Sequence, residues 1–259
     1  MKSQAVQAET ARRFASLHVK GDPVVLYNIW DAGSARAVAK AGARAIATGS
    51  WSVAAAHGFE DGESIPLEFV EQIVRRIAAA VDLPVTVDFE GGYDASAEGV
   101  ARNVARVIAA GAVGINFEDR IVGGAGLHPV AEQSRRIAAI RRASDDSGVA
   151  LFINARTDLF LQAADARQHG SLISEAGQRA ASYRDAGASG LFVPGLVDEK
   201  LIGDLCRSAP LPVNIMMMEG APSTSRLAEL GVARVSYGPL PFIAQMEELE
   251  RRAAVALRR

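Results

Sequence analysis

The chain has 259 residues, of which 49% are hydrophobic and 22% are charged, which is enough for one large folded unit with a filled core. Its net charge of −2, from 28 basic and 30 acidic residues spread along the chain, argues against a nucleic-acid-binding surface. A single cysteine, Cys206, excludes an intramolecular disulfide and a CxxC metal site. Because the sequence has neither a membrane-spanning apolar run nor a secretory signal near its start, we expect a cytoplasmic protein that enters no membrane.

Short apolar segments alternate with alanine-rich helical segments along the whole chain. The pattern predicts a helix at 4–18 and then eight strands, at 24–27, 45–48, 85–88, 114–117, 151–155, 191–193, 213–216 and 234–237. Helices are expected after these strands, at 33–42, 66–80, 96–110, 130–144, 174–186, 198–206, 223–230 and 241–257. The strands read as apolar on both faces, which is typical of strands covered by helices on one side and by a packed interior on the other.

Four of the expected helices end in the same way, with a glycine just before the next strand, in KAGARAIA, AAGAVGIN, DAGASGLF and ELGVARVS. Glycine is favoured there because the residue after a helix often adopts a left-handed conformation. Eight strand–helix units predict an α/β fold, a (β/α)8 TIM barrel that forms a single domain over residues 1–259. A doubly wound sheet is the weaker alternative, because no GxGxxG follows the first strand.

Acidic residues gather where neighbouring strands are expected to end. In a barrel of this kind the functional site lies at the carboxyl ends of the strands. Asp88 and Glu90 are two residues apart, so their side chains share a face, and Glu118 ends the next strand. Three converging carboxylates repel one another unless protons or a cation are bound, and oxygen ligands with several waters suit Mg²⁺. The alternative is that these acids cap helices or pair with Arg120 and Arg156 at a solvated rim.

Two further polar groups are expected at the same end of the barrel. Arg156 follows the fifth strand, where its guanidinium could clamp a substrate carboxylate through two parallel hydrogen bonds. The alternative for Arg156 is a salt bridge to Asp158 or Glu118. The Gly49-Ser50-Trp51 turn after the second strand offers backbone amides that suit an anionic oxygen.

Three motifs, VDFEGGY, INFEDR and INARTD, together resemble the isocitrate lyase/phosphoenolpyruvate mutase superfamily. Further segments that resemble the superfamily are TGSWSVAAAHGFEDGES, VNIMM and YGPLPF, so the resemblance covers nearly the whole chain. It implies a (β/α)8 barrel whose last helix is exchanged between subunits, usually in a homotetramer. It also implies Mg²⁺ held largely through water.

The resemblance gives several residues a role by position. Asp88, Glu90 and Glu118 match the acids of the metal site. Asp61 matches a loop aspartate that contacts the reacting group or the waters on the metal, the alternative being an ordinary residue of an Asp-Gly turn. Further candidates for substrate binding or catalysis come from the resemblance, from the turn after the second strand and from the arginine clamp. They are Gly49, Ser50, Trp51, His128, Arg156 and Asn214.

Three departures separate this chain from other members of the superfamily, one of them being Pro194-Gly195 where the lyases have Pro-Glu after the sixth strand. Glu90 stands where many members have aspartate. The lyases carry a Lys-Lys/Arg-Cys-Gly-His loop, and the matching stretch here keeps His128 but places Gly124 and Gly126 at the lysine and cysteine positions. The residues that match the metal-binding and keto-acid-binding positions of the superfamily are therefore retained, whereas the acid–base loop of the lyases is not. Because glycine adds backbone freedom, we expect the segment Asp119–Pro129 to act as a mobile gate.

The chemistry that the superfamily shares is stabilisation of a pyruvate-like enolate. We therefore expect a Mg²⁺-dependent enzyme that acts on a small α-keto or α-hydroxy acid, with cleavage of a C–C bond as the first choice. Decarboxylation of oxaloacetate and cleavage of a malate-type substrate are examples. The alternatives are P–C bond chemistry, with Asp61 as nucleophile or water-positioning group, and a keto-acid-binding protein without catalysis.

The expected C-terminal helix carries apolar residues on one stripe, at Phe242, Ile243, Met246, Leu249 and Ala253–Val255. A stripe of this kind on a terminal helix indicates packing on another surface. Together with the resemblance, it predicts a homo-oligomer, a dimer or tetramer, in which this helix packs on a neighbouring subunit.

Overall fold

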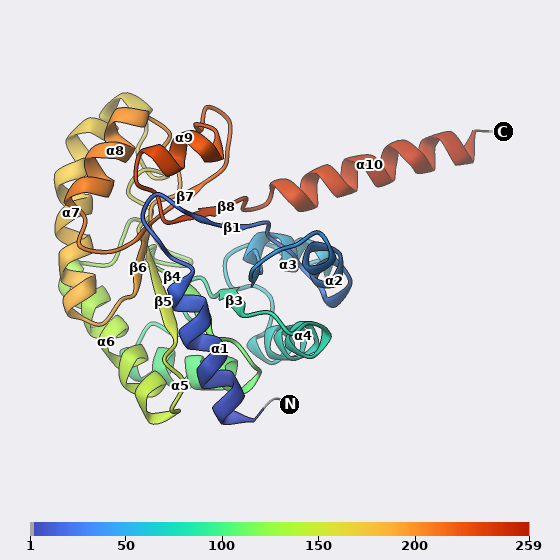
Figure 1. The fold of residues 1–259 in the computed structure, drawn as a ribbon, viewed down its shortest axis with the longest axis horizontal. Helices are drawn as coiled ribbons and strands as arrows, with labels where there is room; N and C mark the ends of the chain where they lie inside the picture. Colours follow the sequence, from blue (N-terminus) through green and yellow to red (C-terminus); the bar gives the residue numbers. More distant parts are fainter. Residues whose placement is uncertain (1–2, 259) are drawn as a thin grey trace.

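The computed structural model describes residues 3–258 and places eight parallel strands in a barrel that is almost closed (Figure 1). The strands are β1 (Val24–Leu26), β2 (Ile46–Ala47), β3 (Val85–Asp88), β4 (Gly114–Glu118), β5 (Phe152–Arg156), β6 (Gly190–Phe192), β7 (Val213–Met216) and β8 (Arg234–Ser236). From β2 to β8 each strand pairs with the next, and β8 pairs with β1. A parallel bridge between Ile29 and Thr48 joins the two remaining edges just beyond β1 and β2. The predicted (β/α)8 barrel is confirmed.

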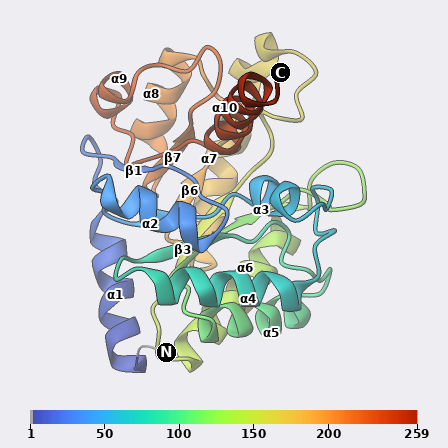
Figure 2. The same cartoon turned by 90° about the vertical axis from the view of Figure 1, so that its right-hand side faces the viewer.

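Helices surround the strands and follow the order expected from the sequence (Figures 1 and 2). They are α1 (Gln4–Ser16), α2 (Ala32–Lys40), α3 (Ser50–Ala56), α4 (Leu67–Ala80), α5 (Ala97–Ala109), α6 (Val130–Asp146), α7 (His169–Asp185), α8 (Glu199–Ser208), α9 (Thr224–Glu229) and α10 (Leu240–Leu257), with a short 3₁₀ helix η1 (Ala166–Gln168) before α7. The local cause is visible in α4, where Val70, Ile73, Val74 and Ile77 recur every three or four residues and are buried.

The glycines expected after helices do adopt left-handed conformations, with φ of 97° at Gly42, 112° at Gly111, 104° at Gly187 and 91° at Gly231. Two elements differ from the prediction. The segment after β2, expected to be a turn, is the helix α3, because SWSVAAA is alanine-rich and Gly49 takes the extended cap position before it. The helix expected at 174 begins at His169, directly after η1.

The expectation that the strands are apolar on both faces is wrong. The face that points into the barrel carries buried polar side chains, at Thr86, Asn116, Asn154, Asn214 and Arg234. These side chains hold one another, because Nδ2 of Asn154 donates to Oδ1 of Asn116 at 2.9 Å and to Oδ1 of Asn214 at 3.0 Å. Polar groups are tolerated in a packed interior when they are paired in this way. Each strand carries few such residues among apolar ones, so the sequence shows no clear alternation between a polar and an apolar face.

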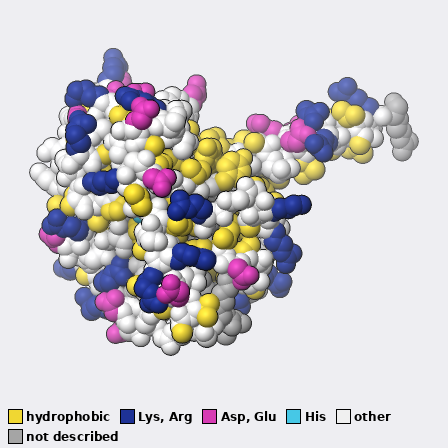
Figure 3. All heavy atoms as spheres, in the orientation of Figure 1, with side chains coloured by type: hydrophobic (Ala, Val, Ile, Leu, Met, Phe, Trp, Pro, Cys, Tyr) yellow, Lys and Arg dark blue, Asp and Glu magenta, His cyan; other side chains and the backbone are white. Residues whose placement is uncertain are grey.

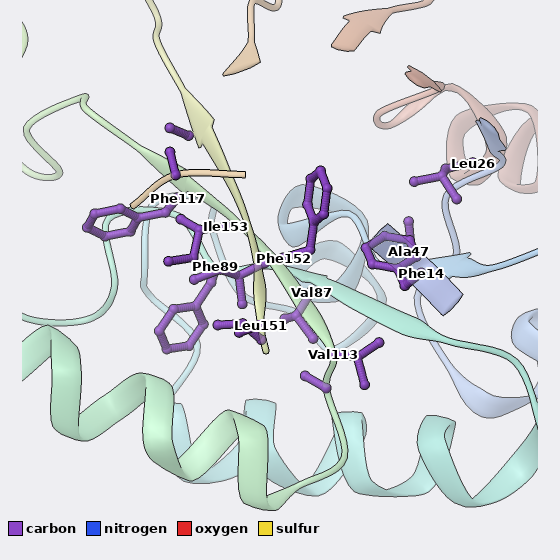
Figure 4. Close-up of a cluster of buried hydrophobic side chains, with 14 of the residues drawn as sticks. Phe14, Leu26, Ala47, Val87, Phe89, Val113, Phe117, Leu151, Phe152 and Ile153 are labelled. Atoms are coloured by element: carbon purple, nitrogen blue, oxygen red, sulfur yellow. The ribbon is translucent and has the colours of Figure 1, made fainter. Parts of the chain in front are cut away.

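The amino-terminal end of the barrel is closed by α1. The fully buried Phe14 meets Phe152, the first residue of β5, edge-on with ring centroids 5.5 Å apart (Figure 4). His18 stacks on the same ring at 3.8 Å. The neighbouring strand begins with Gly114, where an added Cβ would lie 2.6 Å from the Phe14 ring. The lack of a side chain at that position therefore makes room for the aromatic plug.

The last helix, α10, leaves the barrel and projects away from it (Figures 1 and 2). Its buried residues are Pro241 and Phe242, and the Phe242 ring packs edge-on against Trp30 and Trp51 with centroids 5.0 and 5.9 Å away. Hydrophobic side chains gather where α10 joins the body (Figure 3). Within residues 3–258, no helix is long and apolar enough to cross a membrane.

Candidate active site

Asp88, the last residue of β3, is held by hydrogen bonds with three residues. Its Oδ2 accepts hydrogen bonds from the backbone N and the Oγ of Ser50, at 3.1 and 2.8 Å. Its Oδ1 accepts from Nδ2 of Asn116 on β4 at 3.1 Å, and its own backbone N donates to Oγ1 of Thr48 at 3.0 Å. The carboxylate of Asp88 therefore has a fixed orientation at the carboxyl end of the barrel.

Glu90 is held in a backbone conformation that non-glycine residues rarely adopt. Its φ is 48°, and the φ values of Glu63 and Tyr93 are 61° and 59°. Among residues 3–258, these three are the non-glycine residues with positive φ, and they contact one another. The backbone N of Glu63 donates to Oε2 of Glu90 at 2.7 Å, and Oε1 of Glu63 accepts from the backbone N of Tyr93 at 2.8 Å. Strained backbone of this kind concentrates at functional sites.

The acids at the mouth of the barrel disturb one another electrostatically. Burial, followed by the charges of Asp88, Asp61 and Glu118, raises the pKa of Glu90 to about 8. Burial also raises the pKa of Glu118, although the charge of Arg156 opposes the shift. At neutral pH this group of carboxylates does not ionise fully on its own, so it binds protons or needs a further cation.

Arg156, at the end of β5, is already engaged by two carboxylates. Its Nε and one Nη donate to the two oxygens of Asp158 at 2.6 and 3.0 Å, and its other Nη lies 3.1 Å from Oε2 of Glu118. Burial alone would lower the pKa of Arg156, but Glu118 and Asp158 outweigh it, and the pKa is raised. A guanidinium has five N–H groups, so the two ion pairs leave two N–H groups for another ligand. Both interpretations of Arg156 therefore remain compatible with its geometry.

The amides after β2 are used differently from what the resemblance implies. The backbone N of Gly49 donates to the carbonyl of Ile29 at 3.2 Å, and that of Ser50 donates to Asp88. The Gly49 amide therefore belongs to the fold, where it links the ends of β1 and β2. In the first turn of α3, the amide that follows these two belongs to Trp51, whose side chain is 40% exposed beside α10.

The remaining predicted residues lie in different environments. Asp61 lies in the turn before α4, where its side chain reaches solvent but is partly surrounded by protein. This partial burial, followed by the charge of Asp88, raises the pKa of Asp61, and the charge of Arg120 opposes the shift. His128 is half-buried, and burial lowers its pKa. Asn214 is 1% exposed, and its amide bonds with strand neighbours inside the barrel. The structure thus brings Asp61 to the acidic mouth and places Asn214 below it.

The segment Asp119–Pro129 has a fixed base and an exposed tip. Asp119 is fully buried, and its Oδ2 accepts from Arg179 at 3.1 Å and from the hydroxyl of Tyr183 at 2.8 Å. Higher up, Arg120 and Leu127 form an antiparallel bridge. The stretch 123–126 between them is exposed, and the loop stands out from the body after β4 (Figure 2). The base of the segment is therefore anchored, and the mobile gate expected from the sequence stays a prediction that concerns the exposed tip.

The side chains at the mouth fit a water-mediated Mg²⁺ site better than a directly ligated one. Within residues 3–258, no three His, Cys, Asp or Glu side chains lie close enough together to hold a metal ion directly. Asp88, Glu90 and Glu118 are nevertheless close enough for their charges to raise the pKa of Glu90. Mg²⁺ prefers oxygen ligands and usually keeps several of its waters. Carboxylates at this spacing would hold such an ion through those waters.

Three residues that orient the site were missed by the sequence reasoning: Thr48, Glu63 and Asn116 hold Asp88 or Glu90 through the bonds given above. Asn116 carried a usable signal, because it lies two residues before Glu118 on β4 and so shares its face. Glu63 carried none, since its contact depends on a left-handed turn far from Glu90 in sequence.

Comparisons with known proteins agree with this architecture. A family model described as phosphoenolpyruvate phosphomutase matches residues 14–257. The chain belongs to this family, within the PEP mutase/isocitrate lyase superfamily. An uncharacterized protein of Mycobacterium tuberculosis is 36% identical over 231 residues, which cover 89% of this chain and 83% of that protein. The resemblance noted from the sequence is thereby confirmed.

Relatives with named reactions differ in the bond that they act on. A 2-methylisocitrate lyase of Escherichia coli is 30% identical over 90% of this chain and 78% of its own length. An oxaloacetate decarboxylase of Bradyrhizobium is 30% identical over 72% of this chain and 62% of its own length. A solved structure from Burkholderia cenocepacia, provisionally named a phosphonomutase, is 48% identical, with a TM-score of 0.94 and coverage of 96% and 99%.

A phosphonopyruvate hydrolase solved with oxalate and Mg²⁺ has the same fold, with a TM-score of 0.83 over 95% of this chain and 86% of its own. At 22% identity this likeness concerns the fold.

Proposed function

We propose that this protein is a Mg²⁺-dependent enzyme that acts on a small α-keto or α-hydroxy acid through a pyruvate-enolate-like intermediate, and that it cleaves a C–C bond. The observation that carries the proposal is the group of acids at the barrel mouth, in which burial and mutual repulsion raise the pKa of Glu90 to about 8. The phosphonopyruvate hydrolase that shares the fold binds Mg²⁺ and oxalate, which supports the choice of metal and ligand class.

Mg²⁺, when bound, supplies positive charge opposite the developing enolate oxygen. Asp88, Glu90 and Glu118 would hold it through water. Arg156 has two N–H groups that its ion pairs do not use, and these bind the substrate carboxylate. The backbone amide of Trp51, at the start of α3, donates a hydrogen bond to an anionic oxygen of the substrate. Because donors to Asp88 fix its orientation before substrate arrives, the site is organised in advance of the reaction.

Proton transfer is assigned to the residues at the edge of the mouth. Burial, followed by the charge of Asp88, raises the pKa of Asp61, so this carboxyl holds a proton more readily than an ordinary aspartate does. His128 lies on the loop after β4, where it is half-buried and burial lowers its pKa. A solvent water is the other proton source for an enolate.

Decarboxylation of oxaloacetate is the form of C–C cleavage that this loop accommodates best. The lyases' lysine and cysteine positions hold Gly124 and Gly126, so the loop offers no thiol and no ammonium to protonate a departing carbanion. Loss of a positioned general acid costs typically about 10²–10⁴-fold. Decarboxylation releases neutral CO₂ and leaves an enolate that water or His128 protonates. The oxaloacetate decarboxylase relative supports this choice.

P–C bond chemistry is the second candidate, favoured by the 48% identity to the provisional phosphonomutase and by the exposed Asp61 as nucleophile or water-positioning group. The test is an assay of the purified protein with Mg²⁺ on oxaloacetate, malate-type diacids and phosphonopyruvate, with identification of the products. Pyruvate and CO₂ from oxaloacetate support C–C cleavage. Phosphate or phosphoenolpyruvate from phosphonopyruvate supports the second candidate, of the hydrolase or the mutase type. Mg²⁺-dependent affinity for keto acids without any product would show a binding protein instead.

The protein is further proposed to be a homo-oligomer, a dimer or tetramer, through α10. Ile243, Met246 and Leu249 are 36%, 36% and 56% exposed along this projecting helix. A hollow of about 430 Å³ opens between α2 and the root of α10, lined by Tyr27, Trp30 and other residues. An apolar stripe of this size on a monomer surface favours burial against a second copy of the chain.

A further inference from the structure

Arg234, the first residue of β8, is a cation sealed inside the barrel below the acidic mouth. Its side chain is 1% exposed, and one Nη donates to Oδ1 of Asn116 at 3.0 Å. Its Nε and its other Nη have no hydrogen-bond partner, and within residues 3–258 it forms no salt bridge with a carboxylate. Three of its five N–H groups, one on Nε and two on that Nη, are therefore buried without a partner.

A buried guanidinium with unpaired N–H groups lowers the free energy of unfolding of the protein. Removing a charge from water without a paired counter-charge is costly, and apolar residues of similar volume often stabilise a protein when they replace buried charges. Burial lowers the pKa of Arg234 to about 9, with the charge of Asp88 opposing the shift, so the side chain remains charged at neutral pH. Packing alone therefore does not account for an arginine at this position.

The one side-chain bond that Arg234 makes leads directly to the candidate site. The Oδ1 of Asn116 accepts from Arg234 and from Asn154, at 3.0 and 2.9 Å. Because an amide has a carbonyl at one end and an NH₂ at the other, two donors at Oδ1 leave Nδ2 as the end that faces Asp88, at 3.1 Å. If the amide were turned around, its oxygen would face the carboxylate and repel it.

We propose that Arg234 is a positioning residue, which fixes the Asn116 amide and, through it, the orientation of the Asp88 carboxylate. It touches neither the substrate nor the metal. This inference rests on the proposed function for its ligands, Mg²⁺ and a keto acid, but its geometric part concerns the chain alone.

The test compares Arg234→Met with a matched control, Arg141→Met, using Mg²⁺ with oxalate as the probe. Arg141 is a partly buried arginine that bonds the carbonyls of Gly187 and Leu151, away from the acids. Arg234→Met is expected to unfold in urea at the same or a higher concentration than the wild type, yet to bind Mg²⁺–oxalate about tenfold more weakly in calorimetry, or about 1.4 kcal/mol. Arg141→Met is expected to lose stability and to keep its affinity.

Asn116→Leu shows whether Arg234 acts through Asn116. It should weaken Mg²⁺–oxalate binding at least as much as Arg234→Met, and the double variant should be no weaker than Asn116→Leu, because both remove one linked interaction. Additive losses in the double variant, or wild-type affinity in either single variant, would overturn the proposal. Asn116→Leu decides the question even if Arg234→Met does not fold, since unchanged affinity there removes the link.

If the wild-type protein itself does not bind Mg²⁺–oxalate, the proposed function fails, and the positioning role is then decided by a crystal structure of Arg234→Met. An Asn116 amide turned away from Asp88 in that structure supports the role. An amide that keeps its bond to Asp88 contradicts it.

Discussion

The two ends of the barrel are built on opposite principles. At the amino-terminal end, α1 closes the barrel with Phe14 against Phe152 (Figure 4), and Gly114 leaves room for the Phe14 ring. At the carboxyl end, acids crowd together and Glu90 takes a left-handed conformation. One end is filled by packed aromatic rings, while the other gathers carboxylates whose charges raise the pKa of Glu90.

The larger of two hollows lies at the end of the barrel opposite the proposed site. A cavity of about 660 Å³ opens among α1, α4 and α5 near Gln7, Leu83 and Val113, whereas the hollow beside Asp88 and Glu90 measures about 10 Å³. Cavity volume alone would therefore point away from the proposed site. Unbalanced charge and strained backbone are the better guides, because both are costly to the fold and persist where a ligand or reaction uses them.

The largest effect is expected from Asp88→Ala, which removes the best-anchored acid at the carboxyl end. We expect it to abolish both Mg²⁺ binding and turnover while circular dichroism shows a folded barrel, because the residue is only partly buried and ends a strand. Mg²⁺ binding close to that of the wild type would contradict the proposal that the acids of the carboxyl end hold the metal. Asp82→Ala, an exposed acid before β3, serves as the control.

Substrate preference should follow the loop after β4. With Mg²⁺ present, we expect isocitrate and methylisocitrate to be cleaved at least about 10²-fold more slowly than oxaloacetate, because glycines stand at the lyases' lysine and cysteine positions. Initial rates measured side by side on the four substrates, with phosphonopyruvate as the fourth, check this. Efficient cleavage of either isocitrate would contradict this interpretation of the loop.

The amino-terminal end should respond in the opposite sense. Phe14→Ala removes a fully buried ring from the plug, and such truncations typically cost about 3–5 kcal/mol of unfolding free energy. We expect this loss in urea unfolding together with an unchanged affinity for Mg²⁺. A variant that instead kept its stability and lost metal affinity would erase the distinction between the two ends.

Much of the barrel was predictable from the sequence, because its cause is local. Strands β3 and β7 were predicted to the residue, and the glycines that end four helices behaved as expected. The acids at the strand ends were found by the same periodicity. What escaped prediction depends on contacts between distant segments: the bond from Glu63 to Glu90, the use of the Gly49 amide by Ile29, and the polar interior around Arg234.

The projecting helix α10 allows a further test, in which neither end of the barrel is altered. Leu249→Asp places a charge on the exposed apolar stripe, and we expect sedimentation to show a smaller particle than the wild type at micromolar concentration. Glu247→Gln, on the same helix, should leave the assembly unchanged. A stable wild-type monomer at that concentration would contradict the proposed oligomer.

A last effect at the carboxyl end concerns pH. The pKa of Glu90 is about 8 in the folded protein, above its ordinary value of 4.5, so the folded state holds this proton more tightly than the unfolded chain does. Its contribution to stability is full below about pH 4.5 and is lost as the pH rises through about 8. The unfolding free energy of the metal-free protein should therefore fall over this range, and less steeply in Glu90→Gln. A slope of the opposite sign would show that the repulsion among the acids is already relieved.

The central claim is that the charge left unbalanced at the carboxyl end is matched by Mg²⁺ during turnover. The most direct measurement is a titration of Mg²⁺ into chelator-treated wild-type protein, with oxaloacetate consumption and pyruvate formation followed together and corrected for the protein-free reaction. The account predicts no turnover in excess chelator and a saturable return of activity as Mg²⁺ is added. Full activity in excess chelator would contradict it.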